Sequence, residues 1–339
     1  MSADQPHTGQ QEESGVDGAL LEALARVDAF IAEHSEYSRL GVEQPGQGST
    51  NRVVFARRGD TPVVFKVFCE AQRKEREAFA LRHWRQTGLV PWLLWDADPT
   101  IVVMSHVPGM YLAQARESDG EAAWREACRD AGRAIGSLTR VPLTAGDRAA
   151  FESRFYEYPG LAPYLGRILE LARTIHARDP DFRDGFWGEN IEFIEAELDG
   201  ILAQPRVLYH QDVANLHVLN GRFQGFFDLE MCRVGCAAMQ LGSALGMIQE
   251  QAGGWAPFRE GWEDGAAGPL TSGGLRAAAA ASHLLTWRVI SRYLSYDGTP
   301  GTGFSWASPA DPARWQRFIG AVEAMLAIER PGGTAAQDR

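Results

Sequence analysis

The chain has 339 residues, 45% of them hydrophobic and 23% charged, and a formal net charge of -11 at pH 7. This acidic balance argues against a nucleic-acid partner, which would need a basic stripe, and is compatible with a cationic small molecule. The sequence contains no apolar run of about eighteen residues and no signal-peptide pattern, so we expect a cytoplasmic protein without a membrane partner.

Both ends of the chain are polar and rich in small residues. We expect residues 1–16 and 331–339 to be flexible tails, because such segments have too few apolar residues to pack into a core. The length between them suits two lobes, each with a substantial core of its own.

A glycine-rich segment is the first motif of the chain. Gly46, Gly48, Ser49 and Asn51 lie just before an apolar run over residues 53–55. Glycines let backbone amides approach phosphate oxygens, and the Ser and Asn side chains add hydrogen-bond donors. The segment is therefore a candidate turn for covering a phosphate, placed between two strands.

The next apolar run, over residues 62–68, contains Lys66, one of only two lysines in the chain. An unpaired ammonium is costly to bury, so a lysine in the middle of such a strand needs a partner. Residues 71–85 follow, are rich in helix formers and carry two acids, Glu75 and Glu77. Either acid on this helix is a candidate partner for Lys66.

A third apolar strand, over residues 101–105, runs into the pair Pro108-Gly109. A Pro-Gly break of this kind marks a hinge or a domain boundary. We therefore place an N-terminal lobe over residues 17–105 and a C-terminal lobe over residues 106–330.

Beyond this boundary the chain is mostly helical by its pattern. Apolar residues recur at the three- to four-residue spacing of amphipathic helices in residues 121–138, 161–177, 189–203, 237–251, 275–294 and 313–328. Several aromatic and polar residues of this half are candidates to line an acceptor pocket, although each such aromatic belongs more often to a core. They are Glu189, Asn190, Glu192, Trp255, Trp262, Trp287 and Tyr293.

One predicted hairpin interrupts the helices. Its strands flank Asn220-Gly221, the dipeptide that best tolerates the positive φ angles of a two-residue turn. Asp212 then lies in the loop entering the hairpin and Asp228 at its exit, so both carboxylates converge on one face. Glu230, two residues further on, would lie on the same side as Asp228 along an extended backbone.

The run HQDVANLHVL at residues 210–219, followed by FFDLE at residues 226–230, resembles the aminoglycoside phosphotransferase and choline kinase-like superfamily. The loop of that family reads His-Gly-Asp-x-x-x-x-Asn. The resemblance implies a bilobal, protein kinase-like α+β fold. In such a fold, a small antiparallel sheet lobe with one helix precedes a larger, mainly helical lobe that carries the catalytic hairpin. The resemblance also implies phosphoryl transfer from ATP, with Mg²⁺ as a cofactor.

The same resemblance implies roles for single residues. Asp212 accepts or orients the proton of the acceptor hydroxyl, and Asp228 holds Mg²⁺. Lys66 positions the ATP phosphates. Glu77 is the first choice to position Lys66, because it matches the family's Arg-Glu-Ala pattern, and Glu75 is the reserve.

Two further segments take roles from the family. Backbone groups from Ser105 to Val107 would pair with the adenine edge, while Met104 guards the pocket. The glycine-rich turn would cover the phosphates. His210 would brace the catalytic loop and take no part in the chemistry.

The sequence departs from the family at one position. Counting from His210, His217 stands where the family has a metal-binding Asn, and Asn215 lies two residues too early. An imidazole offers nitrogen where Mg²⁺ prefers oxygen. His217 would then bind a softer ion such as Mn²⁺, hydrogen-bond a phosphate oxygen, or report a lost activity. Glu230 is either a replacement oxygen ligand or an ordinary solvated or helix-capping acid.

We therefore expect an ATP-dependent phosphotransferase whose acceptor is a hydroxylated small molecule, an aminoglycoside or another cationic antibiotic or metabolite. Two alternatives stay open. One is a kinase for Ser or Thr in a peptide during natural-product maturation, which needs an open, extended groove. The other is a pseudokinase that binds a nucleotide or a peptide as a partner protein, a reading motivated by His217.

Overall fold

The computed structural model describes residues 10–40, 51–156, 160–178, 186–249, 253–266 and 268–293. The chain forms two compact units. Unit 1 comprises Met1–Arg85 and Pro91–His106, and unit 2 comprises Gln86–Val90 and Val107–Arg339. The chain thus passes into unit 2 after His106, next to the boundary that the Pro-Gly break suggested.

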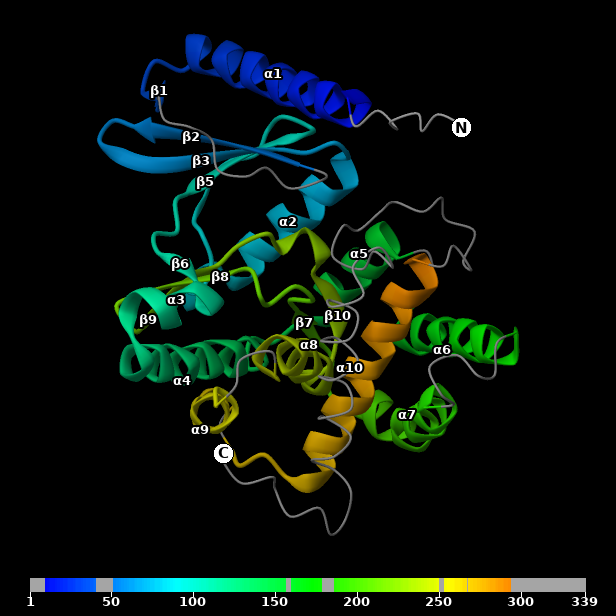
Figure 1. Cartoon of the computed structure of the whole chain (residues 1–339). Coiled ribbons are helices and arrows are strands. Elements are labelled where there is room, and N and C mark those ends of the chain that lie inside the picture. Colours follow the sequence, from blue (N-terminus) through cyan, green and yellow to red (C-terminus); the bar gives the residue numbers. More distant parts are fainter. Residues whose placement is uncertain are drawn as a thin grey trace, which may run out of the picture. The chain divides into compact units, whose positions relative to one another are not determined.

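Unit 1 is built around a five-stranded antiparallel sheet with the strand order β1-β2-β3-β5-β4 (Figure 1). The strands are β1 Tyr37–Arg39, β2 Arg52–Arg58, β3 Thr61–Val67, β4 Leu93–Trp95 and β5 Ile101–Ser105. Strand β3 is central, and its Lys66 lies opposite Val53 of β2 and Val102 of β5. This is the small antiparallel sheet that we expected, with Lys66 on an interior strand.

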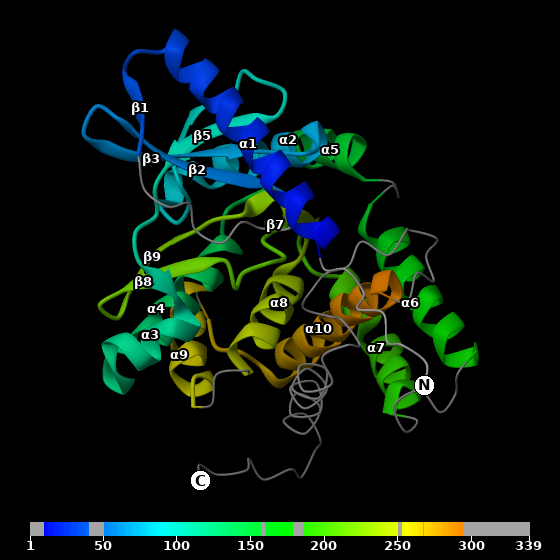
Figure 2. The ribbon, with the colours of Figure 1, turned by 45° about the horizontal axis from the view of Figure 1, so that its top comes forward.

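Two helices accompany the sheet in unit 1: α1, Gln10–Glu33, and α2, Ala71–Trp84. Helix α2 coincides with the segment predicted for it. Helix α1 was not predicted, and residues 10–16, which we assigned to a tail, belong to it. Ala23, Val27 and Phe30 follow one another at helical spacing and pack with the sheet core. Figure 2 shows α1 running beside the sheet. That short apolar stripe is the signal that the sequence analysis missed.

Unit 2 is mainly helical. Its helices in the described ranges are α3 Leu112–Asp119, α4 Glu121–Leu138, α5 Ala145–Phe155, α6 Leu161–Arg178, α7 Phe186–Leu202, α8 Ala237–Gln249, α9 Trp255–Gly265 and α10 Ser272–Tyr293. Five of them match the periodic segments, while α3, α5 and α9 were not predicted. The segment 313–328 lies outside the described residues. Within those ranges every helix is too short or too polar to cross a membrane.

The core of unit 2 is centred on α10, which packs against α6, α7 and α8 (Figures 1 and 2). Ile168 of α6, Ile194 of α7, Met239 of α8 and Trp287 of α10 are buried in this cluster. Residues Val207–Tyr209, strand β7, pair antiparallel with β10, Arg233–Gly235, and carry the chain from this core into the loop of Asp212. The loop therefore starts from a buried, rigid base.

The predicted hairpin is present in unit 2. It consists of β8, Leu216–Leu219, and β9, Arg222–Phe226, and β8 also pairs with the short strand β6, Met110–Tyr111. Asn220 and Gly221 connect the strands with φ angles of 49° and 72°, as the Asn-Gly turn predicts. The register shifts between His217 and Val218, which is the mark of a β-bulge.

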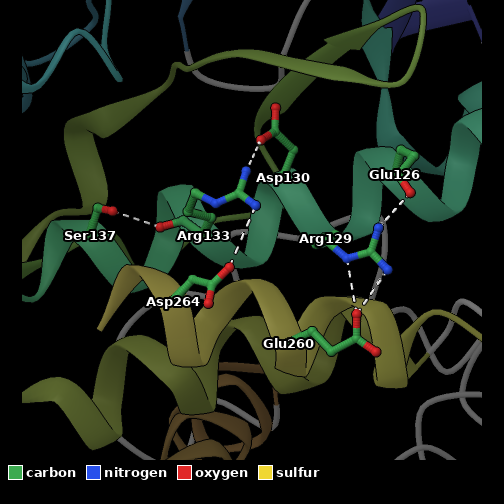
Figure 3. A network of polar contacts seen from close by, with 7 residues as sticks. All are labelled: Glu126, Arg129, Asp130, Arg133, Ser137, Glu260 and Asp264. Carbon is green, nitrogen blue, oxygen red and sulfur yellow. Dashed lines mark hydrogen bonds and ion pairs between the residues drawn. The ribbon is translucent and has the colours of Figure 1, made fainter. Parts of the chain in front are cut away.

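Helices α4 and α9 lie close together because glycines line their contact. A Cβ atom on Gly261 would lie 1.8 Å from the carbonyl oxygen of Arg129, and one on Gly132 would lie 2.1 Å from that of Phe258. Ion pairs flank this contact (Figure 3): Arg129 binds Glu260 at 2.8 Å, and Arg133 lies 3.6 Å from Asp264. Such exposed pairs contribute little, so the close backbone contact is the main link.

Helix α4 also holds the hairpin in place. The Asp130 carboxylate accepts a hydrogen bond from the backbone N–H of Phe223 on β9 at 2.9 Å, and it pairs with Arg133 at 2.7 Å. A rigid contact between α4 and α9 therefore supports the strand that leads to Asp228.

We predict that Gly261→Ala lowers the free energy of unfolding by about 1–3 kcal/mol or more, because a methyl group has no space against Arg129. The matched control is Gly166→Ala on α6, where a Cβ meets nothing within 4 Å. That variant should gain about 0.5–1 kcal/mol from helix propensity. Denaturant unfolding of both variants measures the difference. Equal stabilities would contradict the close contact of α4 and α9.

Candidate functional site

A buried ion pair joins strand β3 to helix α2 in unit 1. Lys66 Nζ lies 2.5 Å from Glu77 Oε2, and the two side chains are 6% and 0% exposed. Phe68 adds its ring at 4.8 Å from Lys66 Nζ. Glu75 is half-buried on the same helix, so the structure selects the first-choice acid. Removing one member of such a pair costs about 3–5 kcal/mol, because the other charge is left buried.

The glycine-rich turn lies largely outside the described residues, so Gly46, Gly48 and Ser49 are not placed. Asn51 is placed and is buried just before β2. Its side-chain Oδ1 lies 3.9 Å from the Cys69 sulfur. The role of this turn in covering phosphates therefore stays a prediction.

The segment expected to contact adenine already uses some of its backbone groups. The N–H of Ser105 donates to the Trp92 carbonyl at 3.0 Å, and the N–H of His106 donates to the Pro62 carbonyl at 3.3 Å. The Val107 carbonyl faces the His217 ring at 2.8 Å. An adenine contact here has to use other backbone groups of Ser105 and Val107, and it stays a prediction. Met104 is buried on β5, in the interior of unit 1.

The Asp212 loop in unit 2 closes in a tight turn. The N–H of Asn215 donates to the Asp212 carbonyl at 2.9 Å, and the N–H of Leu216 donates to the Ala214 carbonyl at the same distance. Asp212 is half-buried at the start of this turn. The turn brings Asn215 forward to the point where strand β8 begins.

Asn215, which the sequence analysis set aside, is the residue whose amide meets Asp228. Its Nδ2 lies 3.2 Å from Asp228 Oδ2, and its carbonyl accepts the Phe227 N–H at 3.0 Å. Counting residues along the loop suggested that Asn215 comes too early. The residue count is misleading here because the loop closes in a short turn. Asn215 therefore already lies where the hairpin begins.

His217 lies on β8 with its ring held by three neighbours. Its Nδ1 is 2.8 Å from the Val107 carbonyl. Its ring packs edge-on against Tyr111 and Phe227, with centroids 5.4 Å and 4.6 Å away. The structure thus gives His217 a packing and hydrogen-bonding role, and its proposed contact with a metal or a phosphate stays untested.

Asp228 ends the hairpin in an unusual backbone conformation. Its φ and ψ are 59° and 53°, in the left-handed region that Asp tolerates better than most residues. A 3-10 helix, Leu229–Met231, follows directly, so the extended backbone that we expected from Asp228 to Glu230 is wrong. A carboxylate oxygen of Glu230 nevertheless lies within 4.8 Å of one of Asp228. Glu230 is buried, which excludes the reading as a solvated acid.

A buried glutamine braces the loop of Asp212, and the sequence analysis did not identify it. Gln240, on α8, accepts the His210 N–H on its Oε1 at 2.8 Å and donates from Nε2 to the His210 carbonyl at 3.3 Å. Both side chains are fully buried. One amide thus satisfies both backbone groups of the residue two positions before Asp212. A glutamine inside the mainly apolar first half of α8 is the signal that could have indicated it.

The residues proposed to line an acceptor pocket belong mainly to the core. Trp287 is fully buried and donates from Nε1 to Asn190 Oδ1 at 2.9 Å, and Trp262 packs beside the α4 contact. Glu189 is exposed. The side chain of Tyr293 lies outside the described residues. Asn190, Trp262 and Trp287 are therefore core residues, whereas Glu192 is exposed and Trp255 half-buried, and a role for any of these residues at an acceptor site stays a prediction.

We predict that Gln240→Met lowers the free energy of unfolding by about 2–4 kcal/mol, because it leaves two buried backbone groups of His210 without partners. It should also speed amide hydrogen exchange at His210. Gln204→Met is the control, because Gln204 Oε1 accepts the Ala238 N–H at 3.0 Å on the same helix but does not touch the loop. Unchanged exchange at His210 in Gln240→Met would contradict the brace.

Comparisons with known proteins give a family for the chain and solved structures with a similar fold. A family model described as the phosphotransferase enzyme family matches residues 41–280. A sequence search of curated proteins found no match.

Solved structures share the fold at low sequence identity. An aminoglycoside phosphotransferase, APH(4)-Ia, has 16% identity and a TM-score of 0.58, covering 91% of this chain and 100% of its own. Plasmodium vivax ethanolamine kinase has 11% identity and a TM-score of 0.57, covering 86% and 83%. A macrolide 2′-phosphotransferase from Brachybacterium faecium has 19% identity and a TM-score of 0.55, covering 89% and 98%. Since the family model also matches more than half of the sequence, this chain belongs to the phosphotransferase enzyme family.

Proposed function

We propose that this protein transfers the γ-phosphoryl group of ATP to a hydroxyl group of a small molecule. The observation that carries the proposal is the set of oxygen-bearing side chains behind the Asp212 turn, where Asn215 contacts Asp228 and Glu230 lies within 4.8 Å of it. Phosphoryl transfer requires mainly positioning and charge neutralisation. These side chains suit charge neutralisation, and the braced loop of Asp212 suits positioning.

Asp212 and Lys66 have separate roles in this proposal. Asp212 orients the acceptor hydroxyl and receives its proton as the new bond to phosphorus forms. Lys66 neutralises and positions the phosphates, and Glu77 holds the Lys66 ammonium at 2.5 Å. A lysine fixed by a buried carboxylate loses little further freedom when a phosphate arrives.

The donor set behind the turn fits a divalent cation of the Mg²⁺ type. Asp228 and Glu230 provide carboxylate oxygens, and rotation of the Asn215 amide presents oxygen in place of nitrogen. When bound, Mg²⁺ would neutralise part of the negative charge of the phosphates. His217 is not needed as a ligand, so the proposal favours Mg²⁺ over the softer Mn²⁺.

The other two functions have weaker support. The pseudokinase alternative is motivated by His217, and the contact of Asn215 with Asp228 weakens the support for it. No observation in the described residues favours the extended groove that a peptide kinase needs. The solved neighbours are named for aminoglycoside, macrolide and ethanolamine, so the chemistry common to them supports only a hydroxylated small molecule as the acceptor.

We predict that calorimetric titration shows Mg²⁺-dependent binding of ATP to the native chain. The Lys66→Met variant should bind ATP at least about tenfold more weakly, because it lacks a charge-assisted contact to phosphate. Lys74→Met is the matched control, because Lys74 is also buried in unit 1 but bonds to the Asp96 carbonyl. Circular dichroism checks that both variants fold. Equal ATP affinity in both variants would remove Lys66 from the site.

We further predict that Asn215→Leu weakens Mg²⁺-dependent turnover and nucleotide binding by about 10- to 100-fold, the usual effect of losing a group that supports a metal site. His217→Phe keeps the ring packing with Tyr111 and Phe227 and should change both by less than about threefold, a difference below 1 kcal/mol. The reverse order of effects would assign the metal contact to His217 and restore the original reading.

A further inference from the structure

An arginine with an unusual environment lies on strand β10, five residues after Asp228. Arg233 pairs in the β7–β10 ladder with Tyr209. Its guanidinium carbon lies 4.8 Å from the ring centre of Tyr164 and 5.7 Å from that of Tyr156. The residue is half-buried, but its Nε is fully enclosed. A cation therefore lies among three tyrosines, next to the strand that leads to Asp212.

Among the described residues no acid lies within ion-pair distance of Arg233, and its Nε has no hydrogen-bond partner there. Tyrosine hydroxyls are neutral at pH 7, and burial raises the pKa of Tyr156 and Tyr209 further. The charge of Asp212 acts on Arg233 and helps to raise its pKa. A buried guanidinium N–H of this kind normally has a hydrogen-bond acceptor, most favourably a carboxylate or phosphate.

The tyrosine hydroxyls divide into two kinds. The Tyr156 hydroxyl donates to the Val234 carbonyl at 2.8 Å. The hydroxyls of Tyr164 and Tyr209 are buried and have no hydrogen-bond partner in the structure. Buried hydroxyls are almost always bonded, so two together beside an enclosed cation need an explanation.

Gly235 shows that the cluster is closely built. A Cβ atom at this position would lie 2.6 Å from the Tyr209 ring. The ring therefore packs directly on the backbone of β10, two residues from Arg233. Arg288 of α10 is a second cation that acts on Tyr209. Positive charge and hydroxyl donors are thus concentrated at one place in unit 2.

We infer that Arg233, with the hydroxyls of Tyr164 and Tyr209, binds an oxyanion, a carboxylate or a phosphate, of the phosphoryl acceptor. This inference rests on the proposed function for the presence of an acceptor and adds its chemical class, a hydroxylated acid. A guanidinium offers a planar fork of donors that matches carboxylate and phosphate oxygens. The two hydroxyls supply further donors once an anion is present.

The position of the cluster suits this role. Tyr209 is three residues before Asp212 on the same β7-to-loop segment. The charge of Asp212 also acts on Arg233, so the cluster lies near the residue proposed to orient the acceptor hydroxyl. The net charge of -11 led us to expect a cationic acceptor. That expectation came from the whole chain, whereas binding depends on the charges beside the bound group.

A series of probes on one carbon skeleton tests the inference: glycerol, 3-amino-1,2-propanediol, D-glycerate and glycerol 3-phosphate. Each is titrated into the full chain by ligand-observed NMR, with a non-hydrolysable ATP analogue and Mg²⁺ present at saturation. We expect the two anions to bind at least about tenfold more tightly than glycerol or the amine, as a charge-assisted contact predicts. The better anion identifies carboxylate or phosphate as the natural group.

Three variants separate anion binding from a structural role of the cluster. Tyr164→Phe removes a hydroxyl without a partner, so it should preserve stability and weaken anion binding by about three- to tenfold, the effect of one hydrogen bond. Tyr156→Phe breaks the bond to Val234, so it should lower stability and leave anion binding unchanged. Arg233→Met should abolish the preference for anions over glycerol.

Several results would overturn the inference. The native chain could bind neither anion, or it could bind the amine as tightly as the anions. Anion binding could also stay unchanged in both Tyr164→Phe and Arg233→Met. The proposed function fails separately, if the ATP analogue does not bind when titrated alone. A third outcome is possible: the native chain binds the anions but no nucleotide, and Arg233→Met loses the anion binding. That outcome would support the anion site and reject the phosphotransferase proposal.

Discussion

The turn from Asp212 to Asn215 is the constraint on which the candidate site in unit 2 depends. Its closure by the Asn215 N–H and the Asp212 carbonyl, at 2.9 Å, ends the loop early. The Asn215 amide thereby reaches Asp228, and His217 moves into the strand, where it meets the Val107 carbonyl. A longer loop would place the imidazole where the amide now lies. The chemistry of the site thus follows from the length of one turn.

A loop that holds several polar groups in fixed places must be supported from outside. Asp228 has a left-handed backbone conformation, which costs of order 1–3 kcal/mol unless its surroundings impose it. Gln240 supports the residue before the turn, and Asp130 supports the strand before Asp228. Both supports come from helices packed in the core of unit 2. The mainly apolar helices therefore contribute to function by restricting the loop, without touching any reacting group.

Periodicity predicted the elements well and the loop poorly, for a physical reason. Helix α4 and the Asn220-Gly221 turn follow from local patterns, because spacing and positive φ are properties of a few neighbouring residues. The contact of Asn215 with Asp228 depends on how the chain turns in three dimensions, which a residue count does not represent. Gln240 was missed for the same reason, because its partner His210 is 30 residues away.

The acceptor illustrates the difference between global and local charge. A chain with 44 acids and 33 basic residues repels anions at long range, but salt screens that repulsion beyond about 10 Å. Within the cluster, Arg233 faces tyrosines that carry no charge at neutral pH, and its positive charge is therefore screened less than a surface charge. An anion that reaches this point is attracted at short range by the half-buried guanidinium, whose charge Asp212 offsets in part, while the distant carboxylates are screened. The acidic surface then affects the rate of association, and Arg233 determines which acceptor stays bound.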